Sequence, residues 1–219
     1  MYKTKPHTPC EMPAPDVTLR VIVLNASLKH EPEISNTEEL AQLVIGEMKD
    51  HKIESEIIRL ADKNIPVGLG FKESDDDEWP MIVEKLKQAH IVIFATPVWW
   101  GGRSSLMQRV IERMDALDEE YIAGGRSALL NKVAGVVITG SEDGAQATLG
   151  SILEVLMFMN FTIPPEACAY WVGEVGQPPS QDREKRLKNK ATEHMAKNMA
   201  RNLVYYAQLL SKYPLVPKE

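Results

Sequence analysis

Polar side chains that could bind an anion follow the first apolar run of the chain, residues 19–24. They are Ser27, Lys29, Ser35, Asn36 and Thr37. Hydroxyls and free backbone N–H groups at the start of a helix attract negative charge, and a lysine adds a full positive charge. The set predicts a site for a terminal phosphate, with simple helix capping by Ser35 as the alternative. The segment matches neither a GxxxxGKS loop nor a GxGxxG turn.

A second segment places two adjacent tryptophans just after the buried apolar run 91–95. Its members are Pro97, Val98, Trp99, Trp100 and Gly101. Successive side chains point apart, so both indole rings cannot enter one core, and one can line a planar, electron-poor ligand such as isoalloxazine. Gly101 lets the backbone approach such a ring. A hydrophobic corner or an interface patch is the alternative interpretation.

A third segment, at the end of the apolar run 133–139, supplies glycines, hydroxyls and a carboxylate. It consists of Thr139, Gly140, Ser141, Asp143 and Gly144. Backbone donors here would stabilise negative charge on a ring that is being reduced. The alternative is an ordinary loop with a capping side chain. The three segments end the first, third and fourth predicted strands, whose carboxyl ends can meet around the switch point of a doubly wound sheet.

The hydrophobic pattern predicts the elements that must position these segments. Apolar runs rich in β-branched residues predict strands at residues 19–24, 53–60, 91–95, 133–139 and 162–170. Helical spacing predicts helices at residues 36–51, 80–88, 104–118, 147–159 and 182–210. This alternation indicates an α/β fold with a doubly wound, five-stranded parallel sheet and helices on both faces. The acidic run 75–78 is interpreted as a solvated loop.

Composition narrows the classes of partner. The 219 residues carry a net charge of −6, and this acidic excess disfavours binding to a nucleic-acid backbone. No apolar run approaches the roughly 18 residues of a membrane-spanning helix, so we expect no membrane association. Cys10 and Cys168 do not form a metal-binding pair, and no metal site is expected. They are interpreted as reduced thiols of a cytoplasmic protein, with a disulfide between them as the alternative.

Three parts are expected along the chain. Residues 1–16 contain four prolines and no apolar signal-peptide core, and are interpreted as an extended N-terminal arm. Residues 17–177 are expected to form the ligand-binding domain, and residues 178–219 a C-terminal helical extension. The predicted helix 147–159 is apolar almost all round, which indicates deep burial or a subunit contact.

The three segments together resemble those of a known enzyme family. The runs LNASLKHEPEISNTEELA, TPVWWGGRSSLMQRVIERMD and ITGSEDGA are similar to the FMN-binding segments of flavodoxin-like NAD(P)H-dependent FMN reductases and quinone oxidoreductases. The resemblance covers about residues 21–171. Two departures are Asn25-Ala26, where many members have glycine, and Lys29, where members often have arginine and its bidentate fork.

The resemblance implies a flavodoxin-like fold, bound FMN, and hydride transfer from NADPH or NADH to the flavin. The electrons would pass on to a small-molecule acceptor: a quinone, a free flavin, a nitro or azo compound, or a metal ion. The chemistry would be centred on the flavin, with no catalytic side chain. A homodimer or homotetramer is expected, and Tyr170 and Trp171 could reach the site of a neighbouring subunit. For Trp171, packing in the core or in an interface is the favoured interpretation.

Two other function classes are compatible with the sequence. The first is a flavodoxin-type electron carrier that binds FMN without nicotinamide-dependent activity. Such carriers tend to be shorter, more acidic and monomeric, whereas Trp99-Trp100 and the apolar helix favour an oligomeric enzyme. The second is a scaffold or regulatory protein that has kept the fold without the flavin, because fold alone does not give function. His30 lies near the first segment and is expected to be exposed rather than catalytic.

Overall fold

The computed structural model describes residues 17–216, so the predicted arm and Cys10 lie outside the described range. The strands are β1 (Leu19–Asn25), β2 (Ile53–Arg59), β3 (Ile91–Trp99), β4 (Gly102–Arg103), β5 (Val133–Gly140) and β6 (Cys168–Val172). The helices are α1 (Asn36–Gly46), α2 (Trp79–Gln88), α3 (Ser105–Arg113), α4 (Asp115–Gly124), α5 (Ala145–Phe158), α6 (Pro179–Lys188) and α7 (Lys190–Lys212), and a short 3-10 helix, η1 (Leu60–Asp62), follows β2.

The strands form one sheet in the order β2-β1-β3-β5-β6. All four neighbouring pairs along this path are parallel, and the two-residue β4 pairs antiparallel with the end of β3. The predicted five-stranded parallel sheet is therefore confirmed. The order reverses between β1 and β3, because the chain first moves outward to β2 and then crosses back. In such sheets the ligand crevice lies at the carboxyl ends of the strands beside this reversal.

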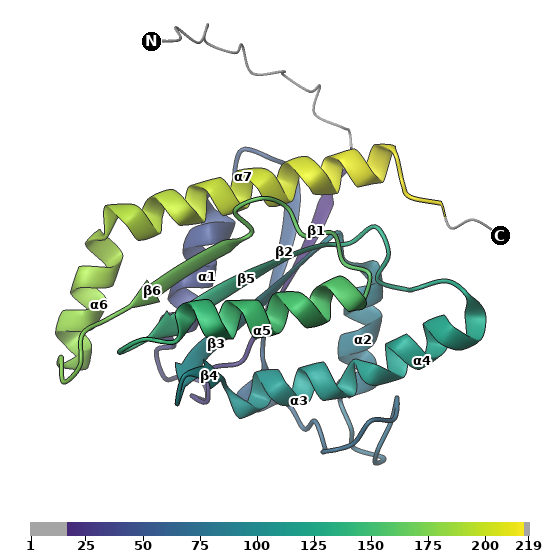
Figure 1. Cartoon of the computed structure of the whole chain (residues 1–219), viewed down its shortest axis with the longest axis horizontal. Helices are drawn as coiled ribbons and strands as arrows, with labels where there is room; N and C mark the ends of the chain where they lie inside the picture. Colours follow the sequence, from purple (N-terminus) through teal and green to yellow (C-terminus); the bar gives the residue numbers. More distant parts are fainter. Residues whose placement is uncertain (1–16, 217–219) are drawn as a thin grey trace, which may run out of the picture.

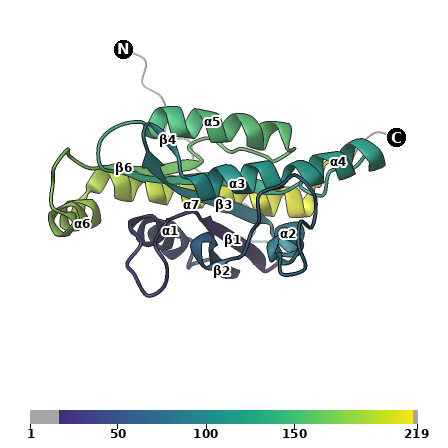
Figure 2. The same ribbon diagram turned by 90° about the horizontal axis from the view of Figure 1, so that it is seen from below.

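Alternate residues of each strand point to opposite faces and build two cores. Val21 and Val23 of β1 pack with α1 and α7, whose buried residues include Met199. Ile22 and Leu24 pack on the other side with α2, α3 and α5. Figures 1 and 2 show the two helical layers with the sheet between them. The expectation of helices on both faces is confirmed.

The C-terminal segment forms two helices where the pattern predicted one, residues 182–210. The break falls at Asn189, whose side chain accepts a hydrogen bond from the N–H of Thr192 (2.9 Å) and so caps α7. The long α7 covers the sheet so closely that a Cβ added to Gly135 would lie 2.6 Å from Met199 Cε. Figure 1 shows α6 at the end of the sheet that also carries β4, and α4 at the opposite end.

Other boundaries also differ from the sequence pattern. β3 continues to Trp99 because its last residues pair with β5 and β4. The predicted helix 104–118 divides at Met114 into α3 and α4. The predicted strand 162–170 reduces to β6 and one bridge at Thr162, since the prolines at 164 and 165 cannot donate to a ladder.

The acidic run 75–78 is not simply a solvated loop. Asp77 is buried, and its carboxylate lies 2.7 Å from the guanidinium of Arg113, with both side chains fully shielded from solvent. The prediction was wrong for this residue because its partner comes from α3, 36 residues later. Elsewhere, Cys168 is a free, half-buried thiol whose pKa burial raises to about 12. No helix within residues 17–216 is both long and apolar enough to cross a membrane.

Candidate functional site

The first polar segment leads from β1 into the start of α1. Ser35 is the N-cap of α1, and its hydroxyl accepts a hydrogen bond from the N–H of Glu38 (3.1 Å). The capping alternative is therefore real, but it uses one N–H of the first turn. Within residues 17–216, the N–H groups of Asn36 and Thr37 have no acceptor. Together with the helix dipole, these two groups are what an anion binds at a helix start.

Lys29 makes two hydrogen bonds within this segment. Its ammonium donates to the carbonyl of Ile34 (2.9 Å), and its backbone N–H donates to the hydroxyl of Ser27 (3.3 Å). The N–H of Ser27 in turn donates to Asn25 Oδ1 (3.1 Å). An ammonium has three donors, so Lys29 can hold the loop and still offer protons to a phosphate.

The first and third segments meet through two buried hydroxyls. The Oγ1 atoms of Thr37 and Thr139 lie 2.7 Å apart, although the two residues are 102 positions apart in sequence. Pro97 is the register partner of Thr139 in the β3–β5 ladder, so the second segment begins at the same edge. The sheet therefore brings the three predicted segments together.

A serine that the sequence reasoning missed joins the first and second segments. The Ser104 hydroxyl donates to the carbonyl of Ala26 (2.7 Å), and its N–H donates to Thr96 Oγ1 (3.1 Å). Ser104 is also the N-cap of α3 and accepts from the N–H of Met107. The available signal was a serine at the start of a helical pattern, but a serine there usually indicates only a cap.

The two tryptophans form the tip of the β3–β4 hairpin. Trp99 is about half exposed (53%), and Trp100 is fully exposed with a left-handed φ of 50°. Neither ring enters the core. The reason is that β3 pairs with β4 in a turn that projects beyond the sheet.

The hairpin rests on the third segment. Gly144 has a φ of 89°, and a Cβ added there would lie 2.9 Å from the Cα of Gly101. A Cβ on Gly140 would lie 3.3 Å from Val98. These two glycines therefore allow a contact between backbones that a side chain would block. Ser141 and Asp143 are exposed, and α5 begins at Ala145 with no side-chain cap, so the capping interpretation of this loop is wrong.

The remaining predicted residues lie as follows. His30 is exposed, as expected, and pairs with Asp62 at 2.8 Å. Trp171 is half-buried, and its indole N–H donates to Asp182 on α6 (2.8 Å). Tyr170 is half-buried in the core that contains α5. Within residues 17–216, no group of three or more acidic, histidine or cysteine side chains could hold a metal ion.

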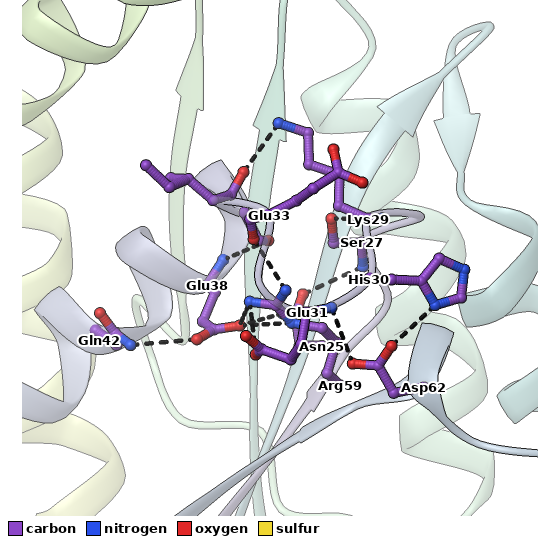
Figure 3. A network of polar contacts seen from close by, with 12 residues as sticks. Asn25, Ser27, Lys29, His30, Glu31, Glu33, Glu38, Gln42, Arg59 and Asp62 are labelled. Atoms are coloured by element: carbon purple, nitrogen blue, oxygen red, sulfur yellow. Dashed lines mark hydrogen bonds and ion pairs between the residues drawn. The ribbon is translucent and has the colours of Figure 1, made fainter.

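Asn25, Glu38 and Arg59 also contact the first segment, and sequence reasoning did not assign them (Figure 3). Asn25 was noted only as part of a departure from the family pattern, directly after an apolar strand, and was given no role. Arg59 ends the second strand. Two hollows accompany these elements. One of about 230 Å³ lies beside Ser35 and Arg59. The other, of about 400 Å³, is lined by the first halves of β1 and β2 and the end of α2, and contains no residue of the three segments.

The donor set fits FMN. A phosphate monoester needs N–H and O–H donors with positive charge, and the start of α1 with Lys29 supplies them. A flat ring system needs exposed aromatic surface and close backbone, which the hairpin and the glycines of the third segment supply.

Comparisons with known proteins identify similar sequences over most of the chain. The model of the family "NADPH-dependent FMN reductase" matches residues 19–174. The divalent metal cation transporter MntH of Mycobacterium bovis is 34% identical over 198 residues, which are 88% of this chain but 29% of that protein. The 8-demethyl-8-aminoriboflavin-5′-phosphate synthase of Streptomyces davaonensis is 30% identical over 207 residues, which are 90% of this chain and 80% of that protein.

Solved structures show the same fold. RosB with the bound intermediate 8-demethyl-8-formylriboflavin-5′-phosphate superposes with a TM-score of 0.79 at 28% identity, covering 90% of this chain and 82% of that one. The apo form of the NADH:FMN oxidoreductase EmoB gives a TM-score of 0.64 at 16% identity, covering 90% and 92%. The chain belongs to the NADPH-dependent FMN reductase family, the flavodoxin-like oxidoreductases that use FMN and a nicotinamide.

Proposed function

We propose that this oxidoreductase passes electrons from NADPH or NADH through FMN to a small-molecule acceptor: a quinone, a free flavin, a nitro or azo compound, or a metal ion. The observation that carries the proposal is the junction of three polar segments at the carboxyl edge of the sheet. It is built by the Thr37–Thr139 contact, the Ser104–Ala26 hydrogen bond and the close approach of Gly144 to Gly101.

Each segment has a distinct part in this proposal. The phosphate would bind Ser27, Lys29, Ser35, Asn36 and Thr37. The ring would lie against Pro97, Val98, Trp99, Trp100 and Gly101, with its pyrimidine edge toward Thr139, Gly140, Ser141, Asp143 and Gly144. Bound FMN supplies the hydride chemistry, while the protein supplies position and electrostatics. The uncapped start of α5 favours negative charge nearby.

Exposed aromatic surface favours a planar acceptor. Trp100 stands fully exposed at the hairpin tip, and Trp99 is half exposed beside it. Planar rings bind well to such surfaces, so quinones and flavins suit the site better than a hydrated metal ion. We also propose a cytoplasmic location and a homodimer or homotetramer. The exposed Met157 and Phe158 on α5 support the subunit contact.

A second candidate comes from two similar proteins: the Streptomyces relative, named as a synthase of 8-demethyl-8-aminoriboflavin-5′-phosphate, and RosB, whose structure holds 8-demethyl-8-formylriboflavin-5′-phosphate as an intermediate. Both descriptions refer to a flavin phosphate that is itself converted. In that case FMN would be the substrate rather than a resident cofactor. Identity of 30% over 80% of that protein favours keeping this candidate. Mass spectrometry of the flavin recovered after turnover separates the two, because a cofactor returns unchanged.

An anaerobic absorbance titration with FMN, followed by NADPH or NADH, tests the main proposal. We expect a bound-flavin band that forms, is then bleached within seconds when the nicotinamide reduces the flavin, and returns when a quinone is added and reoxidises it. A band that neither nicotinamide bleaches would instead indicate an electron carrier. No band would mean that these loops do not bind FMN.

A further inference from the structure

Arg59, the last residue of β2, contacts the loop between β1 and α1, which contains the predicted phosphate donors. Its side chain is 8% exposed. Nη1 donates to the carbonyl of Glu33 (2.9 Å), and Nη2 lies 3.1 Å from a carboxylate oxygen of Glu31. Nε and Nη2 both donate to Glu38 Oε2, at 3.1 and 2.6 Å. One buried guanidinium therefore contacts two points of the loop and the first turn of α1 (Figure 3).

Glu38 extends this connection to β1. The oxygen that receives Arg59 also accepts a hydrogen bond from Asn25 Nδ2 (2.9 Å). The other oxygen accepts from Gln42 (3.3 Å), one turn along α1. The ends of β1 and β2 and the start of α1 are thus tied to a single carboxylate. This arrangement fixes the helix start, whose free N–H groups face the predicted phosphate.

Asp62 holds the middle of the same loop. One carboxylate oxygen lies 2.8 Å from His30 Nδ1, and the other accepts the N–H of Glu31 (3.3 Å). Asp62 is on η1, directly after β2. Arg59 and Asp62 therefore hold the loop on one side, although both are distant in sequence from the predicted phosphate donors.

Arg59 also neutralises negative charge near the predicted phosphate site. Glu31, Glu33, Glu38 and Glu39 lie within nine positions, where a phosphate dianion is expected to bind. Arg59 is the cation shared by Glu31 and Glu38, while two arginines of α6 pair with Glu39. Without Arg59, the partly buried Glu38 carboxylate would repel the phosphate, since solvent screens buried charges poorly.

We propose that Arg59 and Asp62 form a clasp that holds residues 27–35 in the shape that accepts the FMN phosphate. Both are positioning residues, because they act through the loop and through Glu38. The inference rests on the proposed FMN site and adds to it two residues outside the three segments.

Riboflavin provides the discriminating readout, because it carries the same ring without the phosphate. Dissociation constants for FMN and riboflavin would be measured by flavin fluorescence quenching, without turnover. We expect Arg59→Gln to lower the preference for FMN over riboflavin by about tenfold, and Asp62→Ala by about threefold, the scale of lost hydrogen bonds. Arg59→Lys keeps the charge but not the fork, so it should fall between wild type and Arg59→Gln.

Glu78→Ala is the matched control. Glu78 accepts from the N–H of Asn64 (2.7 Å) and from Lys63 (3.0 Å), so it resembles Asp62 in contacts but holds a different loop. It should leave the preference unchanged. If Arg59→Gln fails to fold, Asp62→Ala decides the question, because Asp62 is partly exposed.

Two failures can be told apart. A wild-type protein without preference for FMN over riboflavin would overturn the phosphate site itself. A wild type that prefers FMN, with the same preference in the clasp variants, would overturn only the clasp. Equal weakening of both flavins would also overturn it, because that pattern reports general destabilisation.

Discussion

Replacing Arg113 with methionine is expected to lower the free energy of unfolding by about 3–5 kcal/mol, the usual effect of removing one partner of a buried ion pair. The Arg113 side chain is fully buried. It donates to Asp77 (2.7 Å) and to the carbonyls of Pro66 (3.0 Å) and Phe71 (3.2 Å). The substitution leaves the Asp77 carboxylate without its cation and two carbonyls without their donor.

Asp77 sets the expected pH dependence of this pair. Burial raises its pKa, but N–H donors from Glu73 and Trp79 and the Arg113 guanidinium outweigh burial and hold the pKa below its ordinary value of 3.8. The unfolded chain therefore takes up this proton at a higher pH than the folded one. The stability due to Asp77 is complete above pH 3.8 and is lost as the pH falls through the lowered value.

Urea denaturation followed by circular dichroism measures the effect, with Arg109→Met as the control. Arg109 lies on the same helix and donates to the carbonyl of Ile65 (3.0 Å) in the same loop, but it has no carboxylate partner within residues 17–216. Its loss should cost about 1 kcal/mol. In the double variant Arg113→Met/Asp77→Asn, part of the penalty should be relieved, because no buried charge remains. Equal losses for Arg113→Met and Arg109→Met would refute the reasoning.

Three further outcomes are expected from other parts of the chain. Ser35→Ala and Thr37→Ala should each weaken FMN binding by about 1–3 kcal/mol in a fluorescence titration, and Ser35→Ala should also cost about 1 kcal/mol of stability as a lost cap; unchanged FMN affinity in the double variant would contradict the phosphate assignment. Gly144→Ala should destabilise the fold by about 1–2 kcal/mol in urea, since its φ is 89° and the added Cβ meets backbone; a neutral result would mean that the hairpin moves freely. Burial lowers the pKa of Lys132 from 10.5 to about 8, so between these pH values the unfolded chain binds one more proton than the folded chain. The stability due to this group should therefore rise with pH over that range. A Lys132→Met variant whose stability has the same pH slope would refute this.

Much of the candidate site, the junction of three polar segments, could be predicted because its residues follow directly after recognisable strands. Parallel strands bring their carboxyl ends to one edge, so Thr37 and Thr139 could be expected at that edge without a structure. Arg59 and Ser104 were missed because their partners are far away in sequence. The strand predicted at residues 91–95 was too short because pairing with β4 and β5, which lie later in the sequence, extends β3 to Trp99.

The sequence by itself determined the alternation of strands and helices, the parallel sheet and the three polar segments. These follow from hydrophobic periods of two and 3.6 residues, which are local properties of the chain. The tertiary structure decided which side chains meet across the sheet edge: Arg59 with Glu38, Asp77 with Arg113, and the backbones of Gly101 and Gly144. Burial makes an isolated charge or a single added methyl group costly, so burial decides which of these contacts form. Burial depends on how elements distant in sequence pack together, and no local sequence pattern shows where it occurs.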